Sequence, residues 1–186
     1  MKAFFGHLRN ILVHKFWVYY FGRQIGLDWT QCIFHDITKF SPIEFWESVR
    51  HYQGISSPIP ACKKANGYSL AWQHHKGHNP HHYEYWTDNY DSGTTLIKMP
   101  YKYALEMIAD WMAAGRTYQG KNWSFESQCD WWKTKKETTP GLSIHPETRA
   151  LLDNFFNKEE GVDINEHYEE WRLNRYTFEE DYDGKI

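Results

Sequence analysis

The sequence of 186 residues predicts an all-α fold, a single helical domain of about seven or eight helices. Apolar residues recur at the three- and four-residue spacing of helices through most of the chain. No segment alternates apolar and polar residues between hairpin turns, so a sheet is not expected. The length suits one hydrophobic core, which we expect in residues 5–155, with C-terminal helices and an acidic tail over 156–186.

Two helices are expected at the N-terminal end. The first spans about residues 4–21 and carries His14 on a stripe with other inward-facing side chains. Asp28 is suited to cap a second helix that runs to about residue 40. On such a helix His35 and Lys39 would lie one turn apart, and Asp36 would point about 100° away from His35.

A third helix is expected to begin with a capping box. Ser41 takes the N-cap position, Pro42 the first helical position and Glu44 the third, and the helix would end near residue 52. Prolines and small residues over 54–67 predict a loop between helices.

The stretch HHKGHNPHHYEYW, residues 74–86, is expected to form a bend. A short helix over residues 68–76 leads into it, and Asn79 and Pro80 break that helix. The interleaved aromatic residues favour packed structure over a free histidine tract.

The remaining helices follow a polar loop. The segment YKYALEMIADWMAAG after Pro100 predicts a helix on which Glu106 and Asp110 share a face and which stops at Gly115. The acidic end FEEDYDGKI is expected to be solvated. Further helices are expected over residues 124–136, 146–157 and 164–175.

Composition narrows the classes of function. A net charge of −3 with mixed signs argues against an extended nucleic-acid surface. Three cysteines without CxxC spacing favour a reducing compartment, so a cytoplasmic location is expected. Arg9, His14 and Lys15 interrupt the apolar N-terminal stretch, which argues against a signal peptide, a spanning helix or a membrane partner.

Histidines and carboxylates on four separated segments predict a metal centre. Imidazole and carboxylate ligands suit Fe, Mn, Co, Ni or Zn, and we expect one or two such ions. Lys39 lies near the HD pair and would hold a phosphate that approaches an ion. The expected ligands are His14, His35 with Asp36, the cluster within residues 74–82, and Asp110.

Three motifs carry a resemblance to known families. HDITKFSPIEFW, AWQHHKGHNPHHYEYW and LEMIADW together resemble a bacterial and phage domain family of unknown function over about residues 5–155. The order of the ligands is also similar, more distantly, to that of the HD superfamily of metal-dependent phosphohydrolases, which implies an HD-like helical domain. The segment HDITK resembles the HDxxK form of that superfamily. This similarity implies a first metal held by His14, His35, Asp36 and Asp110, with Asp36 bridging to a second metal held by His75, His81 and His82. His74 and His78 would then have outer roles.

Each of these residues also has an ordinary interpretation. His14 could be an ordinary core histidine. Lys39 could form a salt bridge to Glu44 or Glu47, and Asp110 could accept a hydrogen bond from a ring nitrogen. The pair His35 and Asp36 suits a cap or a surface pair, but its apolar neighbours Ile33, Phe34, Ile37 and Phe40 predict burial.

The leading hypothesis is hydrolysis of a small phosphate ester, such as a nucleotide. Asp36 or Asp110 would orient the attacking water, Lys39 would stabilise negative charge, and a clustered histidine would protonate the leaving oxygen. Glu106 would orient a ligating histidine or accept a proton. The alternatives are a di-iron oxygenase with the same ligands and a non-catalytic, metal-stabilised protein that binds a partner; the oligomeric state is left open.

Overall fold

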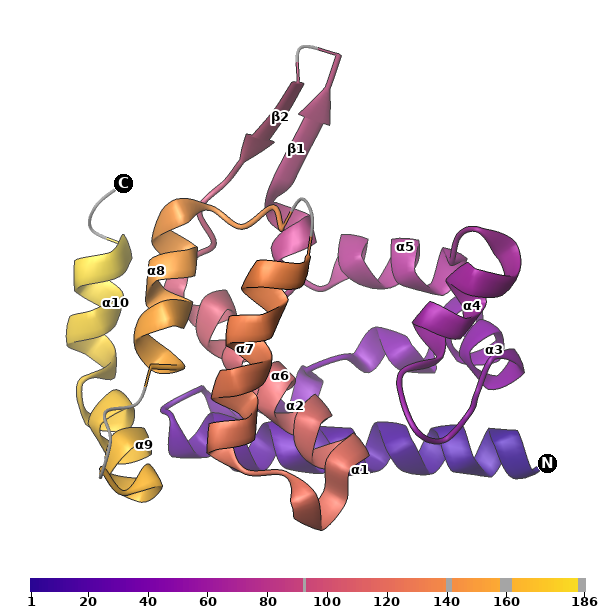
Figure 1. The fold of residues 1–186 in the computed structure, drawn as a ribbon, viewed down its shortest axis with the longest axis horizontal. Coiled ribbons are helices and arrows are strands. Elements are labelled where there is room, and N and C mark those ends of the chain that lie inside the picture. The colour runs from indigo at the N-terminus through magenta and orange to yellow at the C-terminus, as the bar shows by residue number, and fades with distance from the viewer. Residues whose placement is uncertain (92, 140–141, 158–161, 184–186) are drawn as a thin grey trace.

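The computed structural model describes residues 1–91, 93–139, 142–157 and 162–183 (Figure 1). Ten α-helices lie in these ranges, with one small hairpin, so the all-α prediction is confirmed. The count exceeds the expected seven or eight because several helices are short and the C-terminal segment forms two. No helix in the described part is long and apolar enough to cross a membrane.

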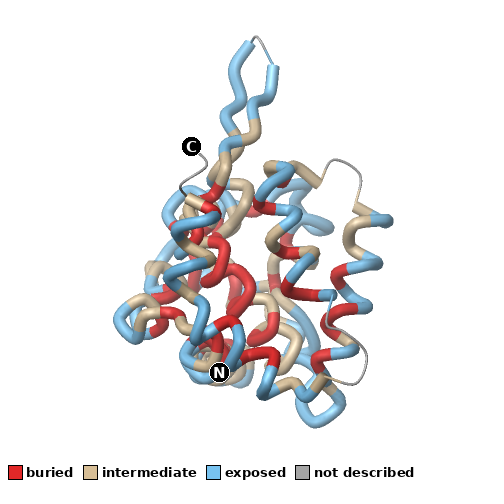
Figure 2. Tube along the Cα trace, turned by 90° about the vertical axis from the view of Figure 1, so that its left-hand side faces the viewer, coloured by how far each residue is buried: buried red, intermediate tan, exposed pale blue. Residues whose placement is uncertain are grey.

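Two long helices position the site. α1 (Lys2–Gln24) packs against α6 (Tyr101–Gln119), which is buried along most of its length. α1 has the expected inward stripe, with His7, Ile11, His14 and Val18 buried. Figure 2 shows the buried residues gathered in the interior, between the helices.

The second helix is shorter than expected, and the difference shapes the site. α2 (Trp29–Phe34) is capped by Asp28 as predicted but ends before His35. Asp36 has φ 55°, in the left-handed region that aspartate tolerates better than most residues. A 3₁₀ turn, η1 (Ile37–Phe40), follows. His35 and Lys39 therefore do not share one α-helix, and the turn lets His35 and Asp36 be buried together.

Three short helices follow η1, within residues 42–78. They are α3 (Pro42–Arg50), α4 (Pro58–Asn66) and α5 (Leu70–His78). The expectation of a loop over 54–67 is wrong for α4. Its signals are present, because Ser57 caps it, Pro58 is its first residue, and Gly67 ends it with φ 82°.

A protruding hairpin was not expected from the sequence. After the 3₁₀ turn η2 (Tyr83–Trp86), β1 (Thr87–Tyr90) pairs antiparallel with β2 (Gly93–Leu96). Figure 2 shows it extending away from the helices and mostly exposed. Because both of its faces meet solvent, the strands need no period-two alternation, and the sequence pattern is absent.

The predicted stop of α6 at Gly115 is wrong. The helix continues to Gln119 and ends at Gly120, before the turn η3 (Gly120–Asn122). Gly115 serves close packing instead. A Cβ atom at this position would lie 2.6 Å from both Trp123 Nε1 and Gln128 Oε1.

Four helices form the C-terminal part of the fold. They are α7 (Phe125–Thr138), α8 (Pro146–Phe155), α9 (Ile164–Leu173) and α10 (Arg175–Asp183). Among them α7, α8 and α10 contact α6, and α8, α9 and α10 lie on the left in Figure 1. The expectation of a solvated tail is wrong as far as residue 183. Tyr182 is buried, and its hydroxyl lies 2.7 Å from Thr148 Oγ1. Residues 184–186 lie outside the described part.

Candidate metal centre

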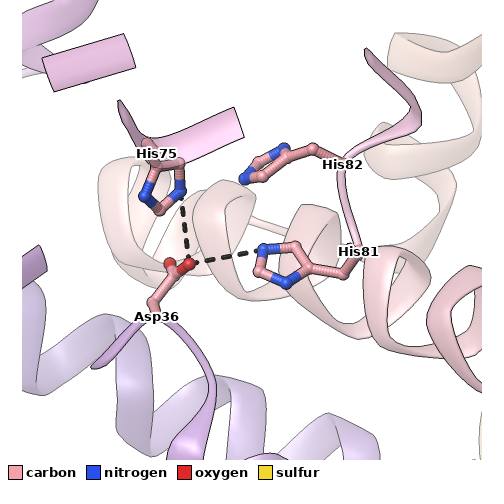
Figure 3. Close-up of side chains that lie close together, drawn as sticks. All are labelled: Asp36, His75, His81 and His82. Atoms are coloured by element: carbon pink, nitrogen blue, oxygen red, sulfur yellow. Dashed lines mark ion pairs between the residues drawn. The ribbon is translucent and has the colours of Figure 1, made fainter. Parts of the chain in front are cut away.

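Seven side chains from separate segments meet beside α6. α1 supplies His14, the turn after α2 supplies His35 and Asp36, and α6 supplies Asp110. His75 comes from α5, and His81 and His82 follow the break at Asn79 and Pro80 (Figure 3). The expected bend therefore exists, and it brings one histidine before the break and two after it toward Asp36.

The carboxylate of Asp36 lies between two groups of ligands. Its Oδ2 is 3.1 Å from His35 Nε2 and 3.5 Å from His14 Nε2. Its Oδ1 is 3.2 Å from His75 Nε2 and 3.3 Å from His81 Nε2, as the dashed lines in Figure 3 show. One oxygen thus faces each group, which is the arrangement that a carboxylate shared by two ions requires.

The other members complete the two groups. Asp110 Oδ1 lies 3.0 Å from His14 Nε2 and 3.4 Å from His35 Nε2. His82 joins Asp36, His75 and His81 in the second group. Within each group one ligand atom from every residue lies within 4.8 Å of the others.

The spacing of these atoms fits a metal ion. Ligand atoms about 2.1 Å from one ion lie about 3.0 Å apart at right angles and about 3.4 Å apart at the tetrahedral angle. Buried Nε2 atoms of His14, His35, His81 and His82 make no directed hydrogen bond, and neither does Asp36 Oδ1. Buried polar atoms without a partner are destabilising, and a cation among them would satisfy them. The two groups are positioned to hold metal.

Glu106 fixes one ring in each group. Its Oε1 lies 2.8 Å from His35 Nδ1 and 3.2 Å from His81 Nδ1, and Gln31 Nε2 donates to Oε2 at 2.5 Å. Burial alone would raise the pKa of this carboxyl, but the hydrogen bonds from His35 and His81 outweigh it and lower the pKa to about 2. With Nδ1–H donated to Glu106, each Nε2 is left as the acceptor that faces Asp36.

Glu44 orients the ring of His75 in the same way as Glu106 orients those of His35 and His81. The sequence did not predict Glu44 as a site residue. Its Oε2 lies 2.7 Å from His75 Nδ1, and its Oε1 lies 2.6 Å from His74 Nδ1. Ser41 accepts a hydrogen bond from the Glu44 backbone, but the Glu44 side chain does not return it, so the predicted capping box is only half formed. The capping interpretation hid this role, because the sequence alone does not show that Glu44 is buried.

The five clustered histidines therefore differ in role. His75, His81 and His82 lie in the second group, whereas His74 contacts Glu44 at its outer side. His78 is exposed, and its ring stacks on that of His74 at 4.1 Å. The structure thus places His75, His81 and His82 inward and His74 and His78 outward, and metal binding by the inner three stays a prediction.

Lys39 contacts the site rather than Glu44 or Glu47. Its Nζ lies 2.5 Å from Asp36 Oδ2, while Glu47 accepts hydrogen bonds from Ser69 and the start of α5. Burial alone would lower the pKa of the Lys39 ammonium, but Asp36 and Asp110 outweigh it and raise the pKa. The salt-bridge alternative that involved Glu44 or Glu47 is wrong.

A cavity of about 200 Å³ opens onto the two groups. Lys39, Asp110 and His82 line the end that contains the groups. The walls come from α1, α3, α4, α5 and α6 and combine apolar and polar side chains, among them His7, Asn10, Ile11, Ile59, Trp72 and Tyr118. A small molecule in this cavity would contact Lys39 and the metal groups together.

Comparison with known proteins identifies a family but no activity. No curated protein and no solved structure matches the chain. The similarity to the HD superfamily therefore stays a prediction. The model of a family of unknown function (DUF5662) matches residues 3–158, a range that contains both ligand groups, Glu44, Glu106 and Lys39. The chain belongs to this family.

Proposed function

We propose that this protein is a metal-dependent phosphohydrolase that acts on a small phosphate ester. The observation that carries the proposal is the shared carboxylate of Asp36, with a group of ligands at each oxygen and the Lys39 ammonium 2.5 Å from Oδ2. Two cations about 4 Å apart and a nearby lysine are suited to a phosphoryl group, whose oxygens carry the negative charge of the reaction.

The residues fit two divalent ions of Fe, Mn, Co, Ni or Zn. His14, His35 and Asp110 would hold one, His75, His81 and His82 would hold the other, and Asp36 would contact both. When bound, such ions supply a Lewis acid for phosphate oxygens and lower the pKa of water.

The side chains then divide the remaining work. Hydrolysis forms a bond between a water oxygen and phosphorus and breaks the ester P–O bond. Asp110 lines the cavity and would orient the water, while the Lys39 ammonium would pair with a phosphate oxygen. Glu106 lies outside the cavity lining with both oxygens engaged, which supports a positioning role over that of a proton acceptor.

The leaving oxygen needs a proton from a group at the cavity. Both ring nitrogens of His75 and of His81 face carboxylates of the site, which leaves them poorly suited to give a proton. His82 lines the cavity but would hold the second ion. Tyr118 and Lys39 line the cavity and carry protons on their polar atoms. We assign this step to one of them, in place of a clustered histidine.

The cavity limits the substrate. Its volume of about 200 Å³ is below the 300 Å³ or more typical of sites for drug-sized ligands, so a phosphate monoester smaller than a nucleotide is favoured, and a mononucleotide would extend beyond the cavity. Lys39 is the only lysine among the residues that line this cavity, and no arginine lines it. Among the described lining residues, no second lysine or arginine is therefore present for a further phosphate group.

The proposal is tested by phosphate release. The protein, purified without a metal-affinity column, is loaded with Mn, Co, Ni or Fe and given a panel of mononucleotides and small phosphate monoesters. Hydrolysis of at least one monoester is expected. Failure with every metal, while circular dichroism shows the fold and elemental analysis shows the bound ions, would contradict the proposal.

Lys39→Met should lower kcat/KM about 100-fold, because one charged donor to the phosphate is lost. Elemental analysis should show the same metal content as in the wild type, since Lys39 is not among the ligands. Lys133→Met, at an exposed position on α7, is the matched control and should retain full activity. Equal loss in both variants, or no loss in Lys39→Met, would remove Lys39 from the reaction.

A further inference from the structure

The N-terminal residues expose an unusually apolar surface. Twelve large apolar side chains in residues 5–46 are each between 40% and 65% exposed, and eleven of them, all but Tyr20, are taken together as one surface. We call this surface the N-terminal apolar face. Its members are Phe5, Leu12, Phe16 and Tyr19 of α1, Trp29, Ile33 and Phe34 of α2, Ile37 and Phe40 of η1, and Ile43 and Trp46 of α3.

These side chains form two rows that run along each other. α1 is about 35 Å long, and the chain returns along it through α2, η1 and α3 (Figure 1). Lys15, midway along α1, donates to the backbone carbonyl of Ile33 at 2.9 Å, which places the end of α2 there. Near the start of α1, the ring of Phe4 contacts those of Phe5 and Trp46 at 5.2 and 5.8 Å. The return row thus follows α1 from its C-terminal to its N-terminal half.

The exposure of the residues beside the HD pair is unexpected. The predicted burial of His35 and Asp36 is confirmed, but the apolar neighbours on which that prediction depended, Ile33, Phe34, Ile37 and Phe40, are themselves exposed. Eleven large side chains that are each about half exposed present on the order of 1,000 Å². The largest apolar patch of a monomer is usually about 300–600 Å², and a stable interface buries about 800 Å² on each partner.

The charges around this face also match a protein interface. α1 contains no aspartate or glutamate. The three carboxylates of residues 1–46 all have partners, because Asp28 caps α2 and because Asp36 and Glu44 face the metal groups. Interfaces between proteins are enriched in aromatic residues and arginine and depleted of carboxylates, as this face is, with Arg9 exposed on α1.

We propose that two copies of this chain pair through the N-terminal apolar face in a two-fold symmetric dimer. A two-fold contact needs one self-complementary surface, and this face presents about the area that a stable partner would bury. His7, Ile11 and His14, on the opposite side of α1, face the cavity and the site, so pairing leaves each cavity open. Pairing also covers η1 and so holds the turn that carries Asp36. The proposal does not depend on the proposed function.

Sedimentation equilibrium of the full, metal-loaded chain tests the dimer. The wild type should be a dimer at micromolar concentration, and Leu12→Glu should raise the dissociation constant at least about 30-fold, as removal of a central interface residue does. Leu173→Glu, the same change at a 70% exposed leucine on α9, should leave the dimer unchanged. Phe16→Glu repeats the test on the same row if Leu12→Glu does not fold.

Several outcomes would overturn the dimer. A wild type that stays monomeric at high concentration would do so, as would equal association of the wild type and both α1 variants. Co-sedimentation of a monomeric wild type with anionic phosphatidylserine vesicles, lost in Leu12→Glu, would assign the face to a lipid surface and not to a second copy. Circular dichroism of each variant confirms that the comparison is between folded proteins.

Discussion

Asp36→Asn should abolish stable binding of both metal ions and lower hydrolysis by more than about 100-fold. Loss of a group that only orients a ligand commonly costs 10–100-fold in metal affinity, and Asp36 faces both groups directly. Asparagine has nearly the same shape and tolerates the φ of 55° at this position, so the turn should persist. Its amide has one neutral oxygen in place of two charged ones. Elemental analysis and phosphate release measure the two effects.

Asp28→Asn provides the matched control for this change. Asp28 caps α2 through Thr30, and asparagine caps helices about as well as aspartate. This variant should keep both metal content and activity. Full metal content in Asp36→Asn, with circular dichroism like that of the wild type, would show that the carboxylate is not shared between ions.

Glu106→Gln should weaken binding of both ions, each by about 10–100-fold. One carboxylate oxygen accepts from His35 and His81, which belong to different groups, and the other accepts from Gln31. A glutamine side chain has a single oxygen, and its NH₂ would meet either the donors of the rings or that of Gln31. Titration against a fluorescent chelator measures the two affinities.

Two further variants separate this effect from a general loss of charge. Glu44→Gln should weaken mainly one ion, because Glu44 contacts His75 of the second group and no ligand of the first. Glu137→Gln, at an exposed position on α7, should change neither affinity. If Glu106→Gln weakened one ion only, or neither, the link between the groups through this carboxylate would be wrong.

The residues that make up the two groups could be proposed from the sequence, whereas the backbone geometry that brings them together could not. Spacing of polar residues on apolar helices made His14 and Asp110 candidates, and their places in the ligand order of the resemblance selected them. The left-handed turn at Asp36 was not visible. Helical periodicity continues through HDITKF, and the turn depends on tertiary contacts of His35 and Asp36, including those with His14 and Asp110.

Two further predictions were wrong or incomplete because the same residues fitted two local structures. Glu44 suited a capping box, so its hydrogen bonds to His74 and His75 were missed. The prolines of 54–67 suited a loop, although Ser57 and Pro58 also suit the start of α4. In both cases the choice depended on burial against distant segments, which a single sequence does not reveal.

The contact of Glu106 Oε1 with His35 and His81 has a thermodynamic consequence. An ion bound by His35 would order the Glu106 carboxylate as well as the His35 ring. The same carboxylate orients His81, a ligand of the other ion. The affinities of the two positions are then linked, and each ion must change the affinity for the other by the same factor. Loading would be cooperative, so the chain would pass from empty to doubly occupied with little of the singly occupied form.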